Sequence, residues 1–234
     1  MVMQVLRFMK TRILSAGREY RRVRFGLAAG YWLPLDRQND LRMEFGVFEW
    51  QLIKYVKGFC SGASVAYDIG SAEGYYTLAF MKEMGENGRV CAFEADPRWI
   101  YEINDTLVKN GLIDRVQVFC GFVADHDDGQ MLSIDHVVAE KGLPLPDIVK
   151  IDIEGAELKA LEGMRRTLSL AMPKIILEVH SASLEDDCLT FLSGHGYTAR
   201  IIDVGLGRLF PEFRPAAHNR WIVACKAVVR PYSG

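Results

Sequence analysis

Apolar residues along this chain occur in short continuous runs that alternate with stretches of helical periodicity. Such runs, rich in β-branched residues, indicate strands buried on both faces, whereas apolar residues three and four positions apart indicate helices. The strand-like runs cover residues 65–69, 88–94, 115–125, 147–153, 174–180, 196–203 and 220–227. Helical patterns follow four of them, over residues 75–84, 97–110, 157–164 and 184–194. This alternation predicts an α/β fold with a doubly wound, Rossmann-like and mostly parallel sheet.

The last two strand-like runs differ from the others because no helical pattern separates them. The loop between them contains Gly205, Gly207, Pro211 and Pro215. Parallel neighbours need a long crossover connection, which is usually a helix. We therefore expect residues 196–203 and 220–227 to form an antiparallel hairpin at the edge of the sheet.

Residues 1–44 are predicted to be a basic N-terminal extension, and residues 45–234 the main domain. Seven Arg and Lys residues face a single acid, Glu19, within residues 1–30, and the apolar residues there have near-helical spacing. One interpretation is an amphipathic helix that contacts an anionic membrane surface or an acidic partner. The other is a helix that packs on the domain or on a neighbouring subunit. The sequence therefore leaves the oligomeric state undecided.

A further helical pattern runs from Phe45 to Val56 and is expected to end near Gly58. It directly precedes the first strand of the domain, where it would cover the loop that follows that strand. Within it, one interpretation of Glu49 and Trp50 is contact with a ligand; the favoured one is an ordinary surface acid and a core aromatic residue.

Composition limits the class of protein. The 234 residues are half apolar, which suffices for one large core, and the formal charge of −2 gives no basic footprint for nucleic acid. Five widely spaced cysteines without a C-x-x-C pair predict free thiols in a reducing compartment and no zinc site. No apolar run reaches the roughly 18 residues of a membrane span, and the N-terminus lacks signal-peptide features. We expect a cytoplasmic protein.

The stretch Asp68-Ile69-Gly70-Ser71-Ala72-Glu73-Gly74 links the first strand to the first helix. Glycines allow a ligand close to the backbone, and a helix start offers free N–H groups. The pattern is not the G-x-G-x-x-G of dinucleotide sites, and its two acids would repel a phosphate. A ligand with an ammonium and a sulfonium group fits better, and S-adenosylmethionine carries both without a phosphate. The alternative is a turn that needs glycine only to start the helix.

Two later acids extend the predicted cofactor site. Glu94 ends the second strand about 20 residues beyond the loop, where a carboxylate can accept both ribose hydroxyls. Asp125 follows the third strand, where a residue facing adenine is expected, although a simple polar turn is the alternative. The candidate cofactor-binding residues are Asp68, Gly70, Ser71, Glu73, Gly74, Tyr75, Glu94, Ala95 and Asp125.

Acids and one imidazole end the fourth and fifth strands of the domain. Asp152 and Glu154 would share a face of a continuing strand, and Glu178 and His180 end the next one. Because ligands bind outside the carboxyl ends of parallel strands, these four are the candidate catalytic residues. Helix capping is an alternative for the first two acids and the favoured role of Glu157.

Two chemistries fit these residues. Mg²⁺ prefers carboxylate oxygens, so Asp152 and Glu178 are the candidates to hold it beside a substrate hydroxyl, although no dedicated metal motif is present. Alternatively, His180 or one of the carboxylates takes the hydroxyl proton directly. The non-functional interpretation of His180 is a partly buried histidine with satisfied hydrogen bonds.

Five stretches together resemble the FkbM-like methyltransferases: DIGSAEGYYT at 68–77, FEADP at 93–97, NGL at 110–112, KIDIEGAE at 150–157 and ILEVH at 176–180. The run KIDIEGAE is the most specific, and the resemblance covers about residues 45–227. It implies the seven-stranded S-adenosylmethionine-dependent fold. It also implies that Asp68, Gly70, Glu73 and Gly74 shape the methionine site and that Glu94 holds the ribose.

The resemblance implies O-methylation of a small hydroxylated acceptor, such as a sugar, glycan or natural product. The chain departs from it at Glu73, where many relatives have Asn, and at Ala95, where many have Pro. One alternative is a catalytically silent cofactor-binding or scaffold protein attached through its N-terminus. The other, nucleic-acid methylation, is disfavoured by the charge balance and by the lack of an Asn-Pro-Pro-Tyr-like motif.

Overall fold

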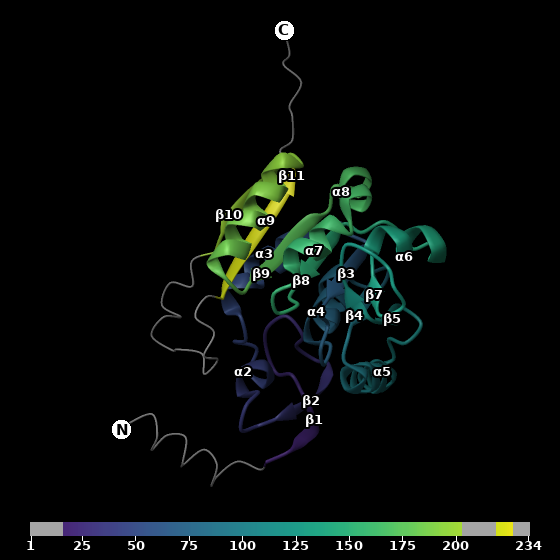
Figure 1. The fold of residues 1–234 in the computed structure, drawn as a ribbon. Helices are drawn as coiled ribbons and strands as arrows, with labels where there is room; N and C mark the ends of the chain where they lie inside the picture. Colours follow the sequence, from purple (N-terminus) through teal and green to yellow (C-terminus); the bar gives the residue numbers. More distant parts are fainter. Residues whose placement is uncertain (1–15, 203–218, 227–234) are drawn as a thin grey trace.

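The computed structural model describes residues 16–202 and 219–226. At its centre is a seven-stranded sheet with the order β10-β11-β9-β8-β3-β4-β5 (Figure 1). Neighbours among the five central strands are parallel, whereas β11 runs antiparallel to both β9 and β10. The predicted sheet and its C-terminal antiparallel hairpin are confirmed. The strands are β3 (Val65–Ile69), β4 (Arg89–Glu94), β5 (Val116–Cys120), β8 (Ile148–Ile151), β9 (Lys174–Val179), β10 (Tyr197–Ile201) and β11 (Arg220–Lys226).

Helices cover both faces of the sheet, which is why its central strands are apolar along their whole length. One core group joins the sheet to α3 (Ile53–Cys60), α4 (Tyr75–Met84) and α5 (Pro97–Asn110). The other joins it to α6 (Ile134–Lys141), α7 (Glu157–Glu162), α8 (Arg165–Ala171) and α9 (Ala182–Gly194). Neighbouring residues of β3 alternate between the two, with Ala66 in the first and Tyr67 in the second, as the period of a strand requires.

Local signals set the ends of α5 as predicted. Asp96 caps it by accepting the backbone N–H of Arg98, Pro97 occupies its first turn, and Gly111 ends it in the left-handed conformation. Beyond β5, two short parallel strands, β6 (Phe122–Val123) and β7 (Met131–Leu132), lead to α6.

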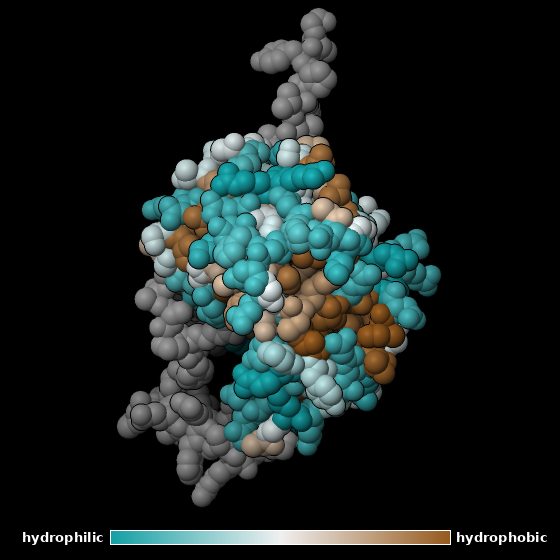
Figure 2. Space-filling model, turned by 45° about the vertical axis from the view of Figure 1, so that its right-hand side comes forward, coloured by the Kyte–Doolittle hydropathy of each residue, from teal (hydrophilic) through white to brown (hydrophobic). Residues whose placement is uncertain are grey.

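Figure 2 shows one face of the molecule that is mostly polar, with apolar side chains gathered in one area of its right-hand half.

The prediction that a helix begins at Phe45 is wrong. Helical structure starts with the short helix η1 (Trp50–Leu52) and continues as α3 to Cys60. The cause is tertiary: Gly46 has φ +69° and lies so close to the chain that a Cβ would meet the Phe25 carbonyl oxygen at 2.1 Å. Trp50 is half exposed, so the expectation of a core aromatic residue is also wrong.

The N-terminal segment packs on the domain. The strands β1 (Arg18–Arg22) and β2 (Trp32–Asp36) form an antiparallel pair, followed by α2 (Leu41–Glu44), at the lower end of the molecule in Figure 1. Arg18 and Tyr20 bind acids of α5 at 2.6 Å, while Val23, Leu27, Leu33 and Leu35 are at most 1% exposed within the core of α4 and α5.

Other predictions fall on residues that the model does not describe. The helical spacing of residues 2–14 and most of the loop of residues 203–218 lie outside the described residues. Among the described ones, no helix has the length and apolarity to cross a membrane.

Candidate active site

The glycine loop is held between the ends of β8 and β4. Gly70 has φ +78°, and a Cβ there would meet the Asp152 carbonyl oxygen at 1.8 Å. The backbone N–H groups of Gly70 and Ser71 both donate to the Phe93 carbonyl, at 2.9 and 3.1 Å. Gly74, with φ +91°, precedes the first residue of α4. Glycine is therefore required at position 70 by the neighbouring strand as well as by the turn.

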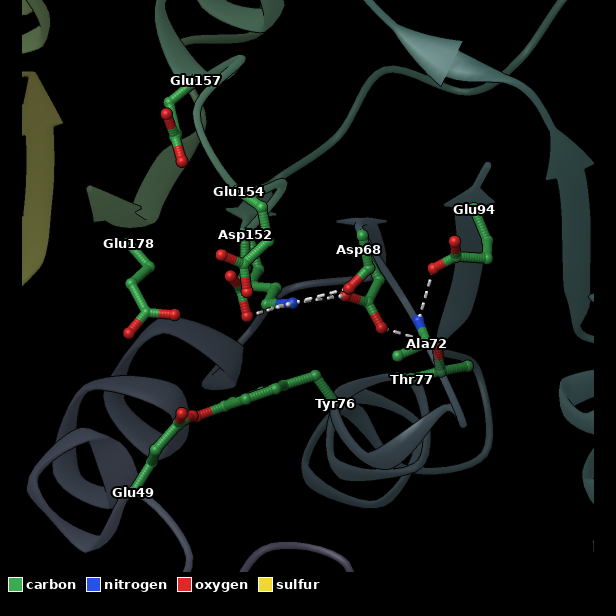
Figure 3. Close-up of polar contacts among 12 residues, drawn as sticks. Glu49, Asp68, Ala72, Tyr76, Thr77, Glu94, Asp152, Glu154, Glu157 and Glu178 are labelled. Atoms are coloured by element: carbon green, nitrogen blue, oxygen red, sulfur yellow. Dashed lines mark hydrogen bonds and ion pairs between the residues drawn. The ribbon is translucent and has the colours of Figure 1, made fainter. Parts of the chain in front are cut away.

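Glu94 ties the same loop to the end of β4 (Figure 3). One carboxylate oxygen accepts the N–H of Ala72, at 2.8 Å, and the other accepts those of Ala95 and Asp96, at 2.8 and 2.9 Å. Ala72 itself is held in the left-handed region, with φ +43°. Glu94 thus positions the loop, and its contact with a ribose stays a prediction.

Lys150 is a central residue of the site that the sequence analysis missed. It is 3% exposed, donates to the Gly70 carbonyl at 2.9 Å, and lies 3.6 Å from Asp68 Oδ1 and 3.5 Å from Asp152 Oδ2. Burial alone would lower the pKa of Lys150, but the surrounding carboxylates raise it to about 12. The sequence did contain a sign of this role, a single Lys within the apolar run of β8. A Lys in a buried strand is almost always paired with an acid, so its position indicated an ion pair.

Asp68 lies fully buried beneath the loop. Thr77 Oγ1 donates to its Oδ2 at 2.7 Å, and Oδ1 has no hydrogen-bond partner among the described residues. Burial raises the pKa of the Asp68 carboxyl, while Lys150 and Thr77 oppose that shift. Its direct contact with a cofactor stays a prediction, and the geometry gives it a role in holding Lys150.

His180 lies at the centre of the acids that end β8 and β9. Its Nδ1 is 2.5 Å from Glu157 Oε1, and its Nε2 is 3.5 to 3.6 Å from oxygens of Asp152, Glu154 and Glu178. Burial would lower the pKa of His180, but Glu157 and Glu178 raise it to about 10. The raised pKa favours the protonated form of His180, which disfavours the predicted role of proton acceptor.

One expectation about the neighbouring acids is wrong, and another is incomplete. Asp152 and Glu154 do not continue β8, which ends at Ile151; instead Glu154 has φ +51°, and a turn brings its carboxylate to His180. Glu157 lies in the first turn of α7, where capping and the helix dipole were its favoured role; it is also fully buried, holds His180 by a hydrogen bond, and accepts the N–H of Gly155 at 2.9 Å. Both roles depend on contacts between β8, α7 and β9.

Three of these side chains could hold a cation. Asp152, Glu178 and His180 each offer one donor atom, and these atoms lie within 4.8 Å of one another. The His180 side chain is 8% exposed, and its Nε2 has no hydrogen-bond partner among the described residues. To bind a cation this nitrogen would have to give up its proton, with Glu157 holding the opposite nitrogen as a carboxylate does behind a metal-bound histidine. Two carboxylates and an imidazole fit Mn²⁺, Fe²⁺ or Zn²⁺ better than Mg²⁺.

Glu49 reaches the same rim from the turn before η1. It accepts the Tyr76 hydroxyl at 2.5 Å, and Figure 3 shows it on the side of Tyr76 that faces Glu178. Burial, followed by the charge of Glu178, raises the pKa of Glu49 to about 8. It is therefore not the ordinary surface acid expected from the sequence, whose helical spacing gave no sign of this turn.

The remaining predicted residues lie apart from the acid cluster. Asp125 is exposed, and its carboxylate forms a hydrogen bond with His126 at 2.8 Å. Burial raises the pKa of Glu73, and the charges of Arg18, Asp40 and Glu102 on other elements also affect that pKa. Ser71 and Tyr75 are buried beside the loop, and the hydroxyls of both have no hydrogen-bond partner among the described residues. Such unmet hydroxyls are rare in a folded interior, and a bound ligand would satisfy them.

Comparisons with known proteins find matches among methyltransferases. Residues 109–199 match the family model of the methyltransferase FkbM domain. The structure of methyltransferase FkbM from Methylobacillus flagellatus KT superposes with a TM-score of 0.55 and 20% identity, over 69% of this chain and 43% of that one. The chain thus spans less than half of that relative. No curated protein matches the sequence.

Two further solved structures share the fold. The O-methyltransferase TomG from Streptomyces achromogenes, in complex with S-adenosylmethionine, has a TM-score of 0.54 and 15% identity, over 75% of this chain and 80% of that one. Precorrin-6y C5,15-methyltransferase from Geobacter metallireducens has a TM-score of 0.50 and 18% identity, over 75% and 89%. The resemblance seen in the sequence is confirmed over residues 109–199, which match the FkbM methyltransferase domain, and the structure shares the fold of these solved methyltransferases.

Proposed function

We propose that this protein transfers the methyl group of S-adenosylmethionine to a hydroxyl of a small molecule, such as a sugar, glycan or natural product. One observation carries the proposal: Lys150 joins the glycine loop, through the Gly70 carbonyl, to Asp152 at the acid cluster. A methyl donor in the loop would then lie beside carboxylates suited to a hydroxyl acceptor.

In the proposed reaction the acceptor oxygen forms a bond to the methyl carbon while the bond from that carbon to sulfur breaks. The electron pair stays on sulfur, and the hydroxyl proton passes to the carboxylate of Asp152 or Glu178. His180, held by Glu157, balances the negative charge of these carboxylates. The protein contributes mainly by aligning oxygen, carbon and sulfur.

A divalent cation held by Asp152, Glu178 and His180 would add Lewis-acid polarisation of the acceptor hydroxyl. Chelation with EDTA distinguishes a reaction that uses this cation from one in which a carboxylate alone accepts the proton. Loss of turnover that Mn²⁺ restores would support the cation, whereas unchanged turnover would leave a carboxylate as the direct proton acceptor.

Titration calorimetry with S-adenosylmethionine and a radiolabelled methyl-transfer screen over hydroxylated sugars, polyketides and phenolics test the proposal. We expect Glu94→Gln to weaken cofactor binding, because the loop loses its anchor. Glu178→Gln should leave cofactor binding near that of the parent and reduce turnover by about 100-fold or more, the usual contribution of a proton acceptor. Glu140→Gln, on an exposed face of α6, is the matched control.

Absence of cofactor binding by the ligand-free protein would reject the proposal. Cofactor binding without transfer to any acceptor would favour the silent scaffold. Transfer to carbon or nitrogen would retain the methyltransferase and reject the hydroxyl acceptor.

A further inference from the structure

A second candidate site lies in the N-terminal segment, outside the residues that match the family model. A cleft of about 570 Å³ opens there, a size typical of small-molecule pockets. Four arginines line it, Arg21, Arg22, Arg24 and Arg37, together with Glu44 and Trp32. It shares no residue with the acid cluster, and β1 and β2, which carry much of its lining, lie at the lower end of the molecule in Figure 1.

The charges of this cleft do not balance. Glu44, 3% exposed at its side chain, accepts two hydrogen bonds from Arg37, at 2.8 and 2.9 Å, and lies 3.5 Å from Arg24. Glu19 pairs with Arg21 at 2.6 Å. The four guanidinium groups that line the cleft are therefore matched by only two carboxylates, Glu44 and Glu19, which leaves a net charge of +2. An anion would neutralise it.

One donor of an arginine that lines the cleft is also unmet. Arg21 Nε is buried and has no hydrogen-bond partner among the described residues. Arginine carries five N–H donors in a planar fork, and a buried donor without an acceptor is costly. The next residue of β1, Arg22, donates from Nε to the Gly30 carbonyl at 3.0 Å, which leaves the rest of its fork for another acceptor.

An aromatic wall completes the cleft. Tyr20 and Trp32 line it, and Lys109 of α5 lies 4.8 Å from the centre of the Tyr20 ring and 5.3 Å from that of Trp32. A fixed fork beside an additional cation suits tetrahedral phosphate oxygens, which arginine binds with two parallel hydrogen bonds.

We propose that this arginine cleft binds a phosphate group, carried either by a free phosphate ester or by a phospholipid headgroup. The inference goes beyond the proposed methyl transfer and stands without it. In the full chain, inorganic phosphate and pyrophosphate are the free probes, and vesicles of phosphatidylcholine with and without phosphatidic acid are the lipid probes.

The double variant Arg22→Gln and Arg24→Gln tests the site, since both residues are exposed and their replacement should leave the fold intact. Arg21→Lys keeps the charge and removes the fork. Arg89→Gln, at the exposed start of β4, is the control for loss of one charge. Calorimetry, vesicle co-sedimentation and urea unfolding are measured for each.

We expect phosphate or pyrophosphate binding that weakens at least about tenfold in the double variant and in Arg21→Lys, and not in Arg89→Gln. That result identifies a free phosphate ester as the ligand class. Sedimentation with acidic vesicles alone, lost in the same two variants, identifies a lipid headgroup. Absence of both, or equal binding by the variants and the control, would overturn the proposal, whatever the outcome of the methyl-transfer assays.

Discussion

At the scale of single residues, the loop depends on the close approach of Gly70 to the carbonyl of Asp152. We expect Gly70→Ala to lower the free energy of unfolding by more than about 3 kcal/mol, because its Cβ would overlap that oxygen. Gly62 is the matched control: its φ of +76° is similar, but no atom lies within 4 Å of its Cβ position. Gly62→Ala should cost only about 1–2 kcal/mol. Urea unfolding measures both, and equal costs would contradict the role of the contact.

Lys150 neutralises the acids that meet beneath the loop. Lys150→Met should destabilise the protein by about 3–5 kcal/mol, because Asp68 stays buried without its cation. Adding Asp68→Asn should restore part of that loss, since both charges are then absent. Lys174→Met, which removes a hydrogen bond to the Phe59 carbonyl and a cation–π contact with the Phe59 ring, is the control in the same urea titrations. A double variant less stable than Lys150→Met would argue against the ion pair.

Single residues also show where sequence reasoning stopped. The strand-end acids Asp152 and Glu178 could be predicted, because parallel strands end at one edge of a sheet. The raised pKa of His180 and its contact with Glu157 could not, because a pKa depends on neighbours brought in by other elements.

At the scale of elements, Glu44 holds α2 to the turn after β2. Hydrogen bonds from Arg37 keep the pKa of Glu44 below its ordinary value. A carboxyl with a lowered pKa contributes stability above about pH 4.3, its usual pKa as a Glu, and loses that contribution as the pH falls through its folded pKa. Glu44→Gln should therefore cost about 3 kcal/mol at pH 7 and progressively less below pH 4.3.

Urea unfolding of Glu44→Gln at pH 7 and in acid, beside the parent protein, measures this difference. Glu162→Gln is the control, since its pair with Arg165 is exposed and should contribute at most about 1 kcal/mol. A cost for Glu44→Gln that does not change with pH would show that the ion pair is not its source.

Elements with strong local signals were predicted well. The cap and the proline fix the start of α5 within its own sequence, and a glycine fixes its end. The helix expected from Phe45 failed because the connection between β1 and β2, at Phe25 and Gly26, approaches Gly46 and imposes a turn. Helical periodicity carries no information about such a distant contact.

At the scale of the whole molecule, the N-terminal segment is part of the core rather than an appendage. Removal of residues 1–44 would take away Val23, Leu27, Leu33 and Leu35, each worth about 1.5–3 kcal/mol when buried. We expect a fragment of residues 45–234 to unfold at markedly lower urea than a chain that begins at residue 16, in which these contacts remain. Equal midpoints would support the boundary at residue 45 that the sequence predicts.

By itself, the sequence determined the alternation of strands and helices, the antiparallel end of the sheet and the acids at the strand ends. These follow from apolar periodicity, glycine positions and short motifs, which are properties of neighbouring residues in the chain. Only the tertiary structure decided that Lys150 joins Asp68 to Asp152, that Glu49 reaches the rim beside Tyr76, and that arginines of β1 line a cleft. Burial and charge at these sites arise from residues far apart in the chain, so no local pattern contains them.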